Sequence, residues 1–515
     1  MRKLVKYIAL LMGAFSLVSC SSDFLNQNPT NYIPTEIVAT PENAGRVFIG
    51  SWYYLLETMS SQANYGYRSL MSADDVMGND VALAGNTYSL GDAYKFLDVS
   101  SNTSGRSTFA WALLYKTIDN CNTVITLEAA ENENTKAFQY AQGHALTVRA
   151  FCYQFLVQHY QFTYLKDKTA LCVPLYTEPT TPTTKPKGKV SVEAIYTQIL
   201  EDLTLAKEKL AGYKNGTDQE KYKPTVNVVD GLLARTYLVM GEWDKAASSA
   251  KAAYSGFDLM EPNAYQGFND ITNKEWIWGH PQSPTQKNAS GYGFSYLDVT
   301  RKSGYCSMLA DPHFRDIFEK DDVRRDLFQW MRDGSLGYRK FITRADETGD
   351  IVLMRAAEMV LIEAEGMARS ANFTLDEAVA PLNTLRAKRN VADYDLTGKT
   401  KEDLIEEILL ERRRELWGEG FSLTDILRTQ KAVERVALTT EYIKTIEEIE
   451  LDQDGKIYTV PCWQATGDKP FINKEPKGHT TAVLPGGGDN NAFVPNSIYY
   501  LYAVPQKEIN ANPEL

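Results

Sequence analysis

Apolar residues recur every three to four positions along much of the chain, the spacing that places them on one face of an α-helix. The pattern is clear over 109–125, returns over about 145–160, and appears again over 192–210. Each such helix must pack its apolar face inward, so the three stretches predict antiparallel helix pairs. The chain is therefore expected to be mainly α-helical.

The clearest repeat lies at 227–255, where small and aromatic residues follow the spacing of a tetratricopeptide helical hairpin. The residues that carry it are Ala234, Tyr237, Gly241, Trp243, Ala246 and Ala253. Small residues let two helices approach closely, a glycine ends the first helix, and the aromatic side chains fill the groove between them. A looser copy with a longer turn follows at 359–387, carried by Ala364, Met367, Phe373 and Ala378. Together they predict a helical-hairpin scaffold over about 106–255 and 353–430.

Three segments lack this periodicity. Residues 60–105 are rich in Gly, Asn, Ser, Asp and Tyr, and residues 256–352 carry short aromatic runs interrupted by Gly and Pro, so both predict loops with short strands. A third irregular segment covers 450–515. Long irregular segments in a compact protein are usually functional or disordered, and their aromatic content argues against disorder. We expect the regions 60–105 and 256–352 to hold a ligand-binding site.

The N-terminus has the features of a lipoprotein signal peptide. Basic residues precede an apolar run over 7–18 that is too short to span a bilayer comfortably, and the run is followed by Cys20. A cysteine at that place is interpreted as the acylated first residue of the mature protein. Residues 1–19 are then removed, 20–35 form a lipidated tether, and 36–515 form one continuous body. An ordinary signal peptide that happens to contain a cysteine is the alternative.

Charge and cysteine content disfavour several classes of protein. The formal net charge of −12 becomes −15 once the three basic residues of the signal peptide are removed, which disfavours nucleic acid as a partner. The five remaining cysteines are odd in number and widely spaced, so we interpret them as small buried residues and not as a disulfide framework. They are Cys121, Cys152, Cys172, Cys306 and Cys462.

Familiar sequence signatures of catalysis and metal binding do not occur. The five histidines form no His-Glu-x-x-His pair, and there is neither a Gly-x-Ser-x-Gly elbow nor a phosphate-binding glycine loop. The stretch from Glu450 begins like a calcium loop but has Pro461 where the bidentate glutamate belongs. A carboxylate pair for glycoside hydrolysis stays an alternative, because its two acids come from distant parts of a chain. We expect no enzyme, no cofactor and no metal.

The segment ERRRELWGEGFSLTDILR, residues 411–428, resembles the C-terminal motif of the SusD/RagB family. Glu407, Glu411 and Glu415 lie four residues apart on one stripe of a helix beside several arginines, which predicts ion pairs with neighbouring helices and not a ligand site. Other stretches that agree with the family are Trp111–Asn122, Arg355–Glu358, Glu363–Glu365, Leu382–Arg386, Val504–Gln506 and Ile509–Pro513. The resemblance covers most of the mature chain.

The resemblance implies a surface lipoprotein in which four tetratricopeptide-like helix pairs support an irregular ligand-binding half. Such proteins sit over a SusC-like TonB-dependent transporter in the outer membrane and face the cell exterior. The implied function is capture of a glycan and its delivery to the transporter, without catalysis. Three alternatives are capture of a peptide, as in the RagB branch, a surface glycoside hydrolase, and a purely structural tetratricopeptide adaptor.

A glycan site needs aromatic faces for the C–H groups of the sugar ring and polar side chains for its hydroxyl groups. The aromatic candidates are Tyr65, Tyr67, Tyr88 and Tyr94 in the first irregular region and Trp276, Trp278, Tyr292 and Tyr296 in the second; the polar candidates are Asp75, Asn79 and Asp80. Trp276 and Trp278 share one face of any strand they form, and that face is alternatively core. Tyr292 and Tyr296, flanked by glycines, are the preferred ligand contacts.

Overall fold

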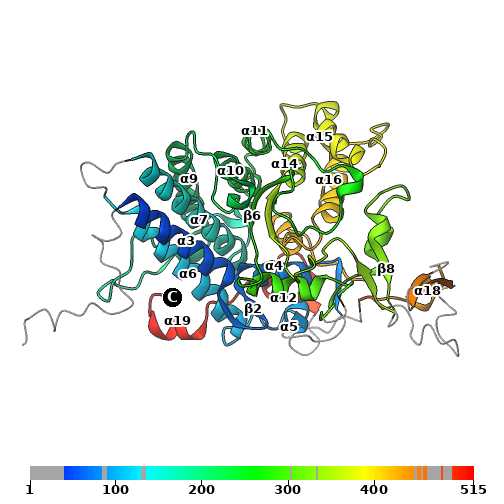
Figure 1. Cartoon of the computed structure of the whole chain (residues 1–515), viewed down its shortest axis with the longest axis horizontal. Coiled ribbons are helices and arrows are strands. Elements are labelled where there is room, and N and C mark those ends of the chain that lie inside the picture. The colour runs from blue at the N-terminus through cyan, green and yellow to red at the C-terminus, as the bar shows by residue number, and fades with distance from the viewer. Residues whose placement is uncertain are drawn as a thin grey trace, which may run out of the picture.

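The computed structural model describes residues 40–83, 90–128, 135–301, 304–331, 334–445, 449–453, 456–460, 477–479 and 490–515. Long helices form an array across the top of the view in Figure 1, and short helices, strands and loops lie below it. The expected fold class is confirmed: the protein is mainly α, with tetratricopeptide-like hairpins and a large region of short elements. Within the described ranges, no helix combines the length and the apolar character needed to cross a bilayer.

The scaffold helices lie side by side in nearly the order of the chain. They are α3 (Pro41–Glu57), α6 (Gly105–Ile125), α7 (Lys136–Tyr160), α8 (Tyr164–Asp167), α9 (Val192–Lys209), α10 (Val226–Met240), α11 (Trp243–Ala253), α14 (Ala356–Arg369), α15 (Leu375–Ala387) and α16 (Lys401–Leu416). All three helices predicted from periodicity are present. Two begin earlier than predicted because a hydroxyl group caps them: Ser104 accepts a hydrogen bond from a backbone N–H of α6, and Thr135 from one of α7.

Both predicted repeats are helical hairpins. The copy at 227–255 is α10 and α11, and Gly241 ends α10 with φ +77°, a left-handed conformation that glycine adopts readily. The copy at 359–387 is α14 and α15, joined by a longer turn. Helices α11 and α14 approach closely at Gly366, where a Cβ atom would lie 2.7 Å from the Trp243 carbonyl oxygen.

The strands of the described part are short and form four sheets. Three are antiparallel pairs: β1 (Met59–Ser61) with β2 (Asn64–Tyr65), β4 (Leu171–Pro174) with β5 (Lys189–Ser191), and β6 (Trp276–His280) with β10 (Ile351–Arg355). The fourth has the order β12-β11-β8-β9-β7-β3 and comprises β3 (Val81–Leu83), β7 (Met308–Ala310), β8 (Phe328–Trp330), β9 (Leu336–Tyr338), β11 (Ile449–Gln453) and β12 (Lys456–Val460). The pairing of β3 with β7 joins the two irregular regions.

Shorter helices occur outside the scaffold array, several of them where loops and strands were predicted. The remaining helices are α4 (Gly66–Met77), α5 (Leu90–Tyr94), α12 (Asn288–Leu297), α13 (Pro312–Asp316), α17 (Ser422–Arg428), α18 (Thr440–Thr445) and α19 (Gln506–Ala511); 3₁₀ turns are η3 (Asp218–Glu220), η4 (Pro262–Ala264), η5 (Arg325–Leu327), η7 (Asn490–Phe493) and η8 (Ile498–Tyr500). The prediction for 60–105 was wrong at α4, which is buried on nearly all sides although it carries charged residues such as Arg68, Asp74 and Asp75. Its Asp74 carboxylate accepts hydrogen bonds from Leu423 N and Thr424 N at the start of α17.

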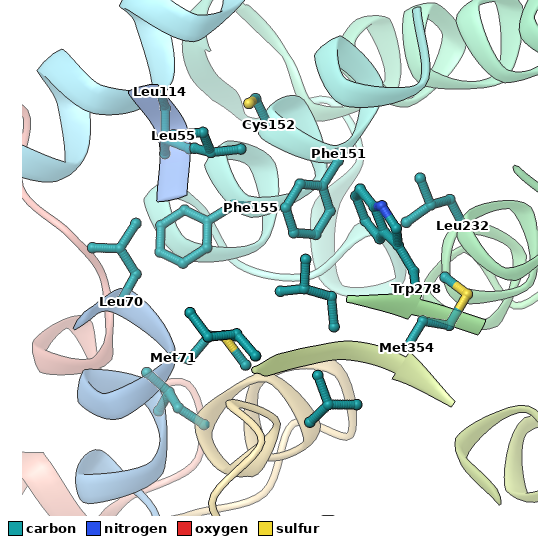
Figure 2. Close-up of a cluster of buried hydrophobic side chains, with 14 of the residues drawn as sticks. Leu55, Leu70, Met71, Leu114, Phe151, Cys152, Phe155, Leu232, Trp278 and Met354 are labelled. Atoms are coloured by element: carbon teal, nitrogen blue, oxygen red, sulfur yellow. The ribbon is translucent and has the colours of Figure 1, made fainter. Parts of the chain in front are cut away.

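One large buried cluster joins the scaffold to the short elements. Figure 2 shows side chains of α7, α4 and β6 pointing into a shared space, among them Phe151 and Phe155, Met71, and Trp278. The rings of Phe151 and Trp278 lie 4.9 Å apart and nearly perpendicular. A smaller cluster fills the space between α14, α15 and α16. Apolar contacts therefore fix the short elements against the scaffold.

The glutamate stripe of α16 forms ion pairs with other segments, as predicted. Glu415 is fully buried and contacts Arg324, Arg355 and Arg389 at 2.7, 2.6 and 2.8 Å. Glu411, also buried, contacts Arg324 at 2.6 Å. Burial alone would raise the pKa of Glu415, but the guanidinium groups of Arg389 and Arg355 hold it well below its usual value. The motif is therefore a packing and ion-pair element.

Four of the five cysteines that follow Cys20 lie in the described part, and all four are unbonded thiols. Cys121, Cys152 and Cys172 are buried as predicted, whereas Cys306 is half-buried. Residues outside the described ranges include the signal peptide and the whole tether with Cys20, as well as Tyr88, Cys462 and much of 450–515. The described residues contain no group of three or more His, Cys, Asp and Glu side chains arranged to hold a metal ion.

Candidate ligand-binding site

Four tyrosine rings lie in a row where α12 meets the β1–β2 hairpin. Tyr65 lies between Tyr292 and Tyr296, with ring centroids 6.0 and 5.9 Å away. Tyr305 then stacks on Tyr296 at 5.3 Å, with 23° between the ring planes. We call these four residues the tyrosine row. Because Tyr65 comes from the first irregular region and the other three from the second, the structure brings the two predicted regions together.

Exposure rises toward the ends of the tyrosine row. Tyr65 and Tyr296 are fully buried, Tyr292 is half-buried and Tyr305 is 38% exposed. The preferred residues Tyr292 and Tyr296 lie on helix α12 and not in a loop. Gly293 allows this helix to pack closely, because a Cβ there would lie 2.8 Å from the side chain of Arg68. Tyr296 therefore supports Tyr305 from beneath, and Tyr292 and Tyr305 supply the accessible surface.

Backbone hydrogen bonds fix the segment that carries Tyr305 to α12. Tyr305 N donates to Ser295 Oγ at 3.1 Å, Cys306 N to Ser295 O at 2.9 Å, and Ser307 N to Tyr296 O at 3.0 Å. A ring held in this way loses little conformational freedom when a ligand binds. Tyr305 was not among the residues predicted from the sequence. It nevertheless ends a Ser-Gly-Tyr triplet, as Tyr292 does.

A polar pocket of about 400 Å³ adjoins the same hairpin. We call it the hairpin pocket; it is lined by Ser61, Ala63, Asn64, Asp92, Leu97, Asp98, Ser104, Gly105 and Arg106. The Arg106 guanidinium contacts Asp98 at 2.6 Å and donates to the Ala63 carbonyl oxygen at 3.2 Å. Burial acts to lower the pKa of Arg106, but the Asp98 carboxylate raises it by more, so the guanidinium stays charged. The Tyr296 hydroxyl donates a hydrogen bond of 2.9 Å to the backbone carbonyl oxygen of Gln62, which lies between two lining residues in the chain, and this bond links the pocket to the tyrosine row.

A larger cleft of about 870 Å³ lies between α16, α17 and the end of α4. The three polar candidates Asp75, Asn79 and Asp80 line this cleft and not the hairpin pocket. Asp80 pairs with Arg413 at 2.6 Å, and Asn79 Oδ1 accepts a hydrogen bond from Glu434 N at 2.8 Å. Burial raises the pKa of Asp75 well above its usual value. Asp75 also accepts a hydrogen bond from Gly420 N at 3.0 Å. All three groups are therefore engaged within the protein, and we do not include them in the proposed site.

The other described aromatic candidates are covered by the protein itself. Trp276 and Trp278 are fully buried, so the face they share on β6 is core. Tyr67 packs on Phe151, with the ring centroids 4.7 Å apart. Tyr94 is half-buried, and a guanidinium group lies 4.0 Å from its ring centroid. These rings offer little free surface for stacking, and we do not include them in the proposed site.

The protein is a tetratricopeptide-like helical scaffold that carries an aromatic surface and a polar pocket on its short elements. Residues 327–515 match the family model described as "SusD family", and residues 23–238 match one described as "Starch-binding associating with outer membrane". The crystal structure of a SusD-like carbohydrate binding protein from Bacteroides vulgatus is 36% identical, with a TM-score of 0.82 over 92% of this chain and 97% of that chain. The chain belongs to the SusD family, as the 411–428 motif indicated.

Two further comparisons extend the likeness. A SusD superfamily protein from Bacteroides thetaiotaomicron shares the fold, with a TM-score of 0.70 and 20% identity over 92% of this chain and 98% of that chain. The SusD-like protein P38 of Formosa agariphila is 35% identical over 96 residues, which are 17% of this chain. The match spans only 18% of that curated relative.

Proposed function

We propose that the protein captures a glycan at the tyrosine row and delivers it unchanged to a SusC-like TonB-dependent transporter. The observation that carries this proposal is the exposed Tyr305 ring, held rigidly on the buried Tyr296 ring. Such a flat surface suits the C–H face of a sugar, and the hairpin pocket supplies polar groups beside it. The relative from Bacteroides vulgatus that is 36% identical is described as carbohydrate binding, which supports the same function.

We further propose that the protein is anchored in the outer membrane through acylated Cys20 and faces the cell exterior. The signal-peptide features support the anchor, and the matching family model described as associating with the outer membrane supports the location. Exchange of Cys20 for Ser should abolish incorporation of labelled palmitate into the protein. Equal incorporation in the variant and the wild type would contradict a lipid anchor on Cys20. Recovery of a TonB-dependent transporter with the anchored protein would support the partner.

Binding of the soluble form, residues 21–515, to plant, fungal and host glycans and to mixed peptides tests the function. Tyr305→Ala removes the stacking surface and should weaken glycan binding about five- to tenfold, or ~1–1.4 kcal/mol. Phe373→Ala is the matched control. Phe373 is 37% exposed, nearly the same as Tyr305, but lies in the turn between α14 and α15, so its loss should leave affinity unchanged.

Saturable binding to one glycan class that falls in Tyr305→Ala and persists in Phe373→Ala supports capture at the tyrosine row. Binding of peptides alone would replace glycan capture with peptide capture. Release of reducing ends from a bound glycan would show a glycoside hydrolase. Equal affinity in the wild type and Tyr305→Ala would show that the tyrosine row is not the site.

A further inference from the structure

We infer that the cleft of about 870 Å³ between α16 and α17 docks an extended, cationic segment of a partner protein. We call it the α16 cleft. The inference concerns a surface apart from the tyrosine row and does not rest on glycan capture. Three features carry it: an apolar floor, an acidic rim, and two carboxylates at its ends that lack an ion-pair partner in the described part of the chain.

The floor of the α16 cleft presents apolar side chains that lie outside the hydrophobic cores. Leu410 on α16 and Phe421 at the start of α17 line the cleft and are half-buried. Neither packs against the two buried clusters of the described residues. Such side chains favour the binding of an apolar group, because contact with it removes their remaining surface from water. The partner segment therefore needs apolar side chains that fill the floor.

The rim of the α16 cleft is acidic, since seven acidic and only three basic side chains line it. The three basic ones all have acidic partners in the lining: Arg412 contacts Asp425 at 2.9 Å, Arg413 contacts Asp80 at 2.6 Å, and Lys431 pairs with Glu406. The exposed carboxylates of Asp403 and Glu434 form no ion pair within the described ranges. A cationic partner would supply the missing charge, and an anionic one would be repelled.

The positions of Asp403 and Glu434 set the spacing of the cationic groups. Asp403 lies in the first turn of α16, where its carboxylate accepts a hydrogen bond from Thr400 N at 2.8 Å. Glu434 lies at the other end of the cleft, because its backbone N–H donates to Asn79 Oδ1, next in the chain to the Asp80 that pairs with Arg413.

The separation of these two ends follows from the geometry of α16. Arg413 lies ten residues beyond Asp403 on this helix, with Leu410 between them, and ten residues of α-helix span ~15 Å. Extended chain covers that length in about five residues. A helix of the same length is marginal when isolated. We therefore assign an extended segment with two cationic residues five positions apart and apolar residues between them.

Calorimetric titration of the soluble form at low ionic strength with acetyl-Lys-Ser-Leu-Leu-Ser-Lys-amide tests the inference. This peptide has the required spacing of its two cationic residues and an apolar centre. It should bind saturably and more weakly as salt is added. Replacement of both lysines by glutamate, or of both leucines by serine, should weaken binding at least tenfold. The peptides thus separate the contribution of charge from that of the apolar floor.

Variants of the protein test whether the peptide occupies the α16 cleft. Glu434→Gln removes an unpaired carboxylate and should weaken binding about two- to fivefold, whereas Lys431→Gln removes a competing cation and should strengthen it by a similar factor. Leu410→Lys places a cation on the floor and should weaken binding at least tenfold. Glu402→Gln is the matched control for charge, because Glu402 is exposed on α16 outside the cleft. Leu205→Lys, on α9, is the control for an exposed leucine.

Binding that weakens in Glu434→Gln, strengthens in Lys431→Gln and is unchanged in both controls supports the inference. Absence of saturable binding, or equal binding of the glutamate peptide, overturns it. Equal affinity in the wild type, Glu434→Gln and Lys431→Gln would place the peptide elsewhere and also overturns it. A dimer in sedimentation velocity that Leu410→Lys abolishes would show a second copy as the occupant, and displacement of the peptide by a captured glycan would show a glycan site; either result replaces the inference.

Discussion

Glu415→Gln should destabilise the fold strongly although the substitution changes the shape of the side chain very little. Glu415 is the carboxylate on which three buried arginines converge. Arg324 keeps Asp322 as a partner after the substitution. Arg389 keeps only one carboxylate partner, Glu275, at 3.4 Å. The amide left behind cannot offset the guanidinium charge, so the cost arises mainly at Arg389.

Removal of one partner from a buried ion pair costs about 3–5 kcal/mol. Unfolding entropy is about 2.1 cal/mol/K per residue, or ~1 kcal/mol/K for a body of roughly 480 residues, so Tm should fall by about 3–5 °C. The measurement is thermal unfolding of the soluble form at pH 7.5. Glu406→Gln is the matched control on the same helix, because Glu406 pairs with Lys431 at an exposed site and should change stability by less than about 1 kcal/mol.

A double-mutant cycle with Arg389→Met locates the cost. Because Glu415→Gln leaves the Arg389 charge without its main carboxylate partner, Arg389→Met should lower the free energy of unfolding by less in the Glu415→Gln background than in the wild type. The expected difference is about 0.5–3 kcal/mol. The pKa of Glu415 is held below its usual value, so its contribution is present above the pKa of the unfolded chain and is lost as pH falls through the folded value. The deficit of Glu415→Gln should therefore shrink in acid. Equal Tm values for Glu415→Gln and Glu406→Gln, or additive effects in the cycle, would refute this reasoning.

Two more predictions concern the scaffold. Burial lowers the pKa of His144 to about 3, so between 6.5 and 3 the unfolded chain takes up a proton that the folded chain does not, and stability falls as pH falls. At pH 5 the free energy of unfolding is lower by about 2 kcal/mol than at neutral pH. His144→Leu should therefore reduce the fall in Tm between pH 7.5 and 5 by ~2 °C. An identical fall in the wild type and the variant would contradict this prediction. Gly366→Ala should lower stability by about 1–3 kcal/mol because its Cβ meets backbone atoms of α11. Gly50→Ala, in an open part of α3, should raise stability by up to about 1 kcal/mol, and a similar loss in both glycine variants would argue against a steric cause.

Sequence reasoning succeeded where a single helix carried its own signal. The stretches 109–125 and 227–255 have apolar faces at helical spacing, and a glycine with positive φ ends α10 as predicted. It failed at α4, where Arg68, Asp74 and Asp75 are buried. The two aspartates read as loop because most of their hydrogen-bond partners come from a segment hundreds of positions away. For Asp74, these partners are the backbone N–H groups at the start of α17.

The candidate site, like the fold, was predicted only where the local sequence carries the signal. Richness in tyrosine and glycine pointed to the right regions, but not to which rings face water. Tyr292 and Tyr305 each end a Ser-Gly-Tyr triplet. Tyr292 is half-buried on α12, and Tyr305 is more exposed beside it, so position in the fold decides their exposure. Trp276 and Trp278 are as aromatic as any candidate, yet β6 directs both into the core. Exposure depends on what covers a side chain, and that is set by the packing of distant segments.

The sequence by itself determined the helical scaffold, the hairpin repeat and the ion-pairing character of the 411–428 motif, because each depends on residues close together in the chain. Only the tertiary structure decided which tyrosine is accessible, that Asp75, Asn79 and Asp80 line a cleft apart from the hairpin pocket, and that Asn64, Asp98 and Arg106 meet in that pocket. The tyrosine row and the hairpin pocket arise where α4, α6, α12 and the β1–β2 hairpin converge, and the cleft arises where the end of α4 meets α16 and α17. Local spacing carries no information about such contacts, since the free energy of burial and pairing is settled between elements and not within them.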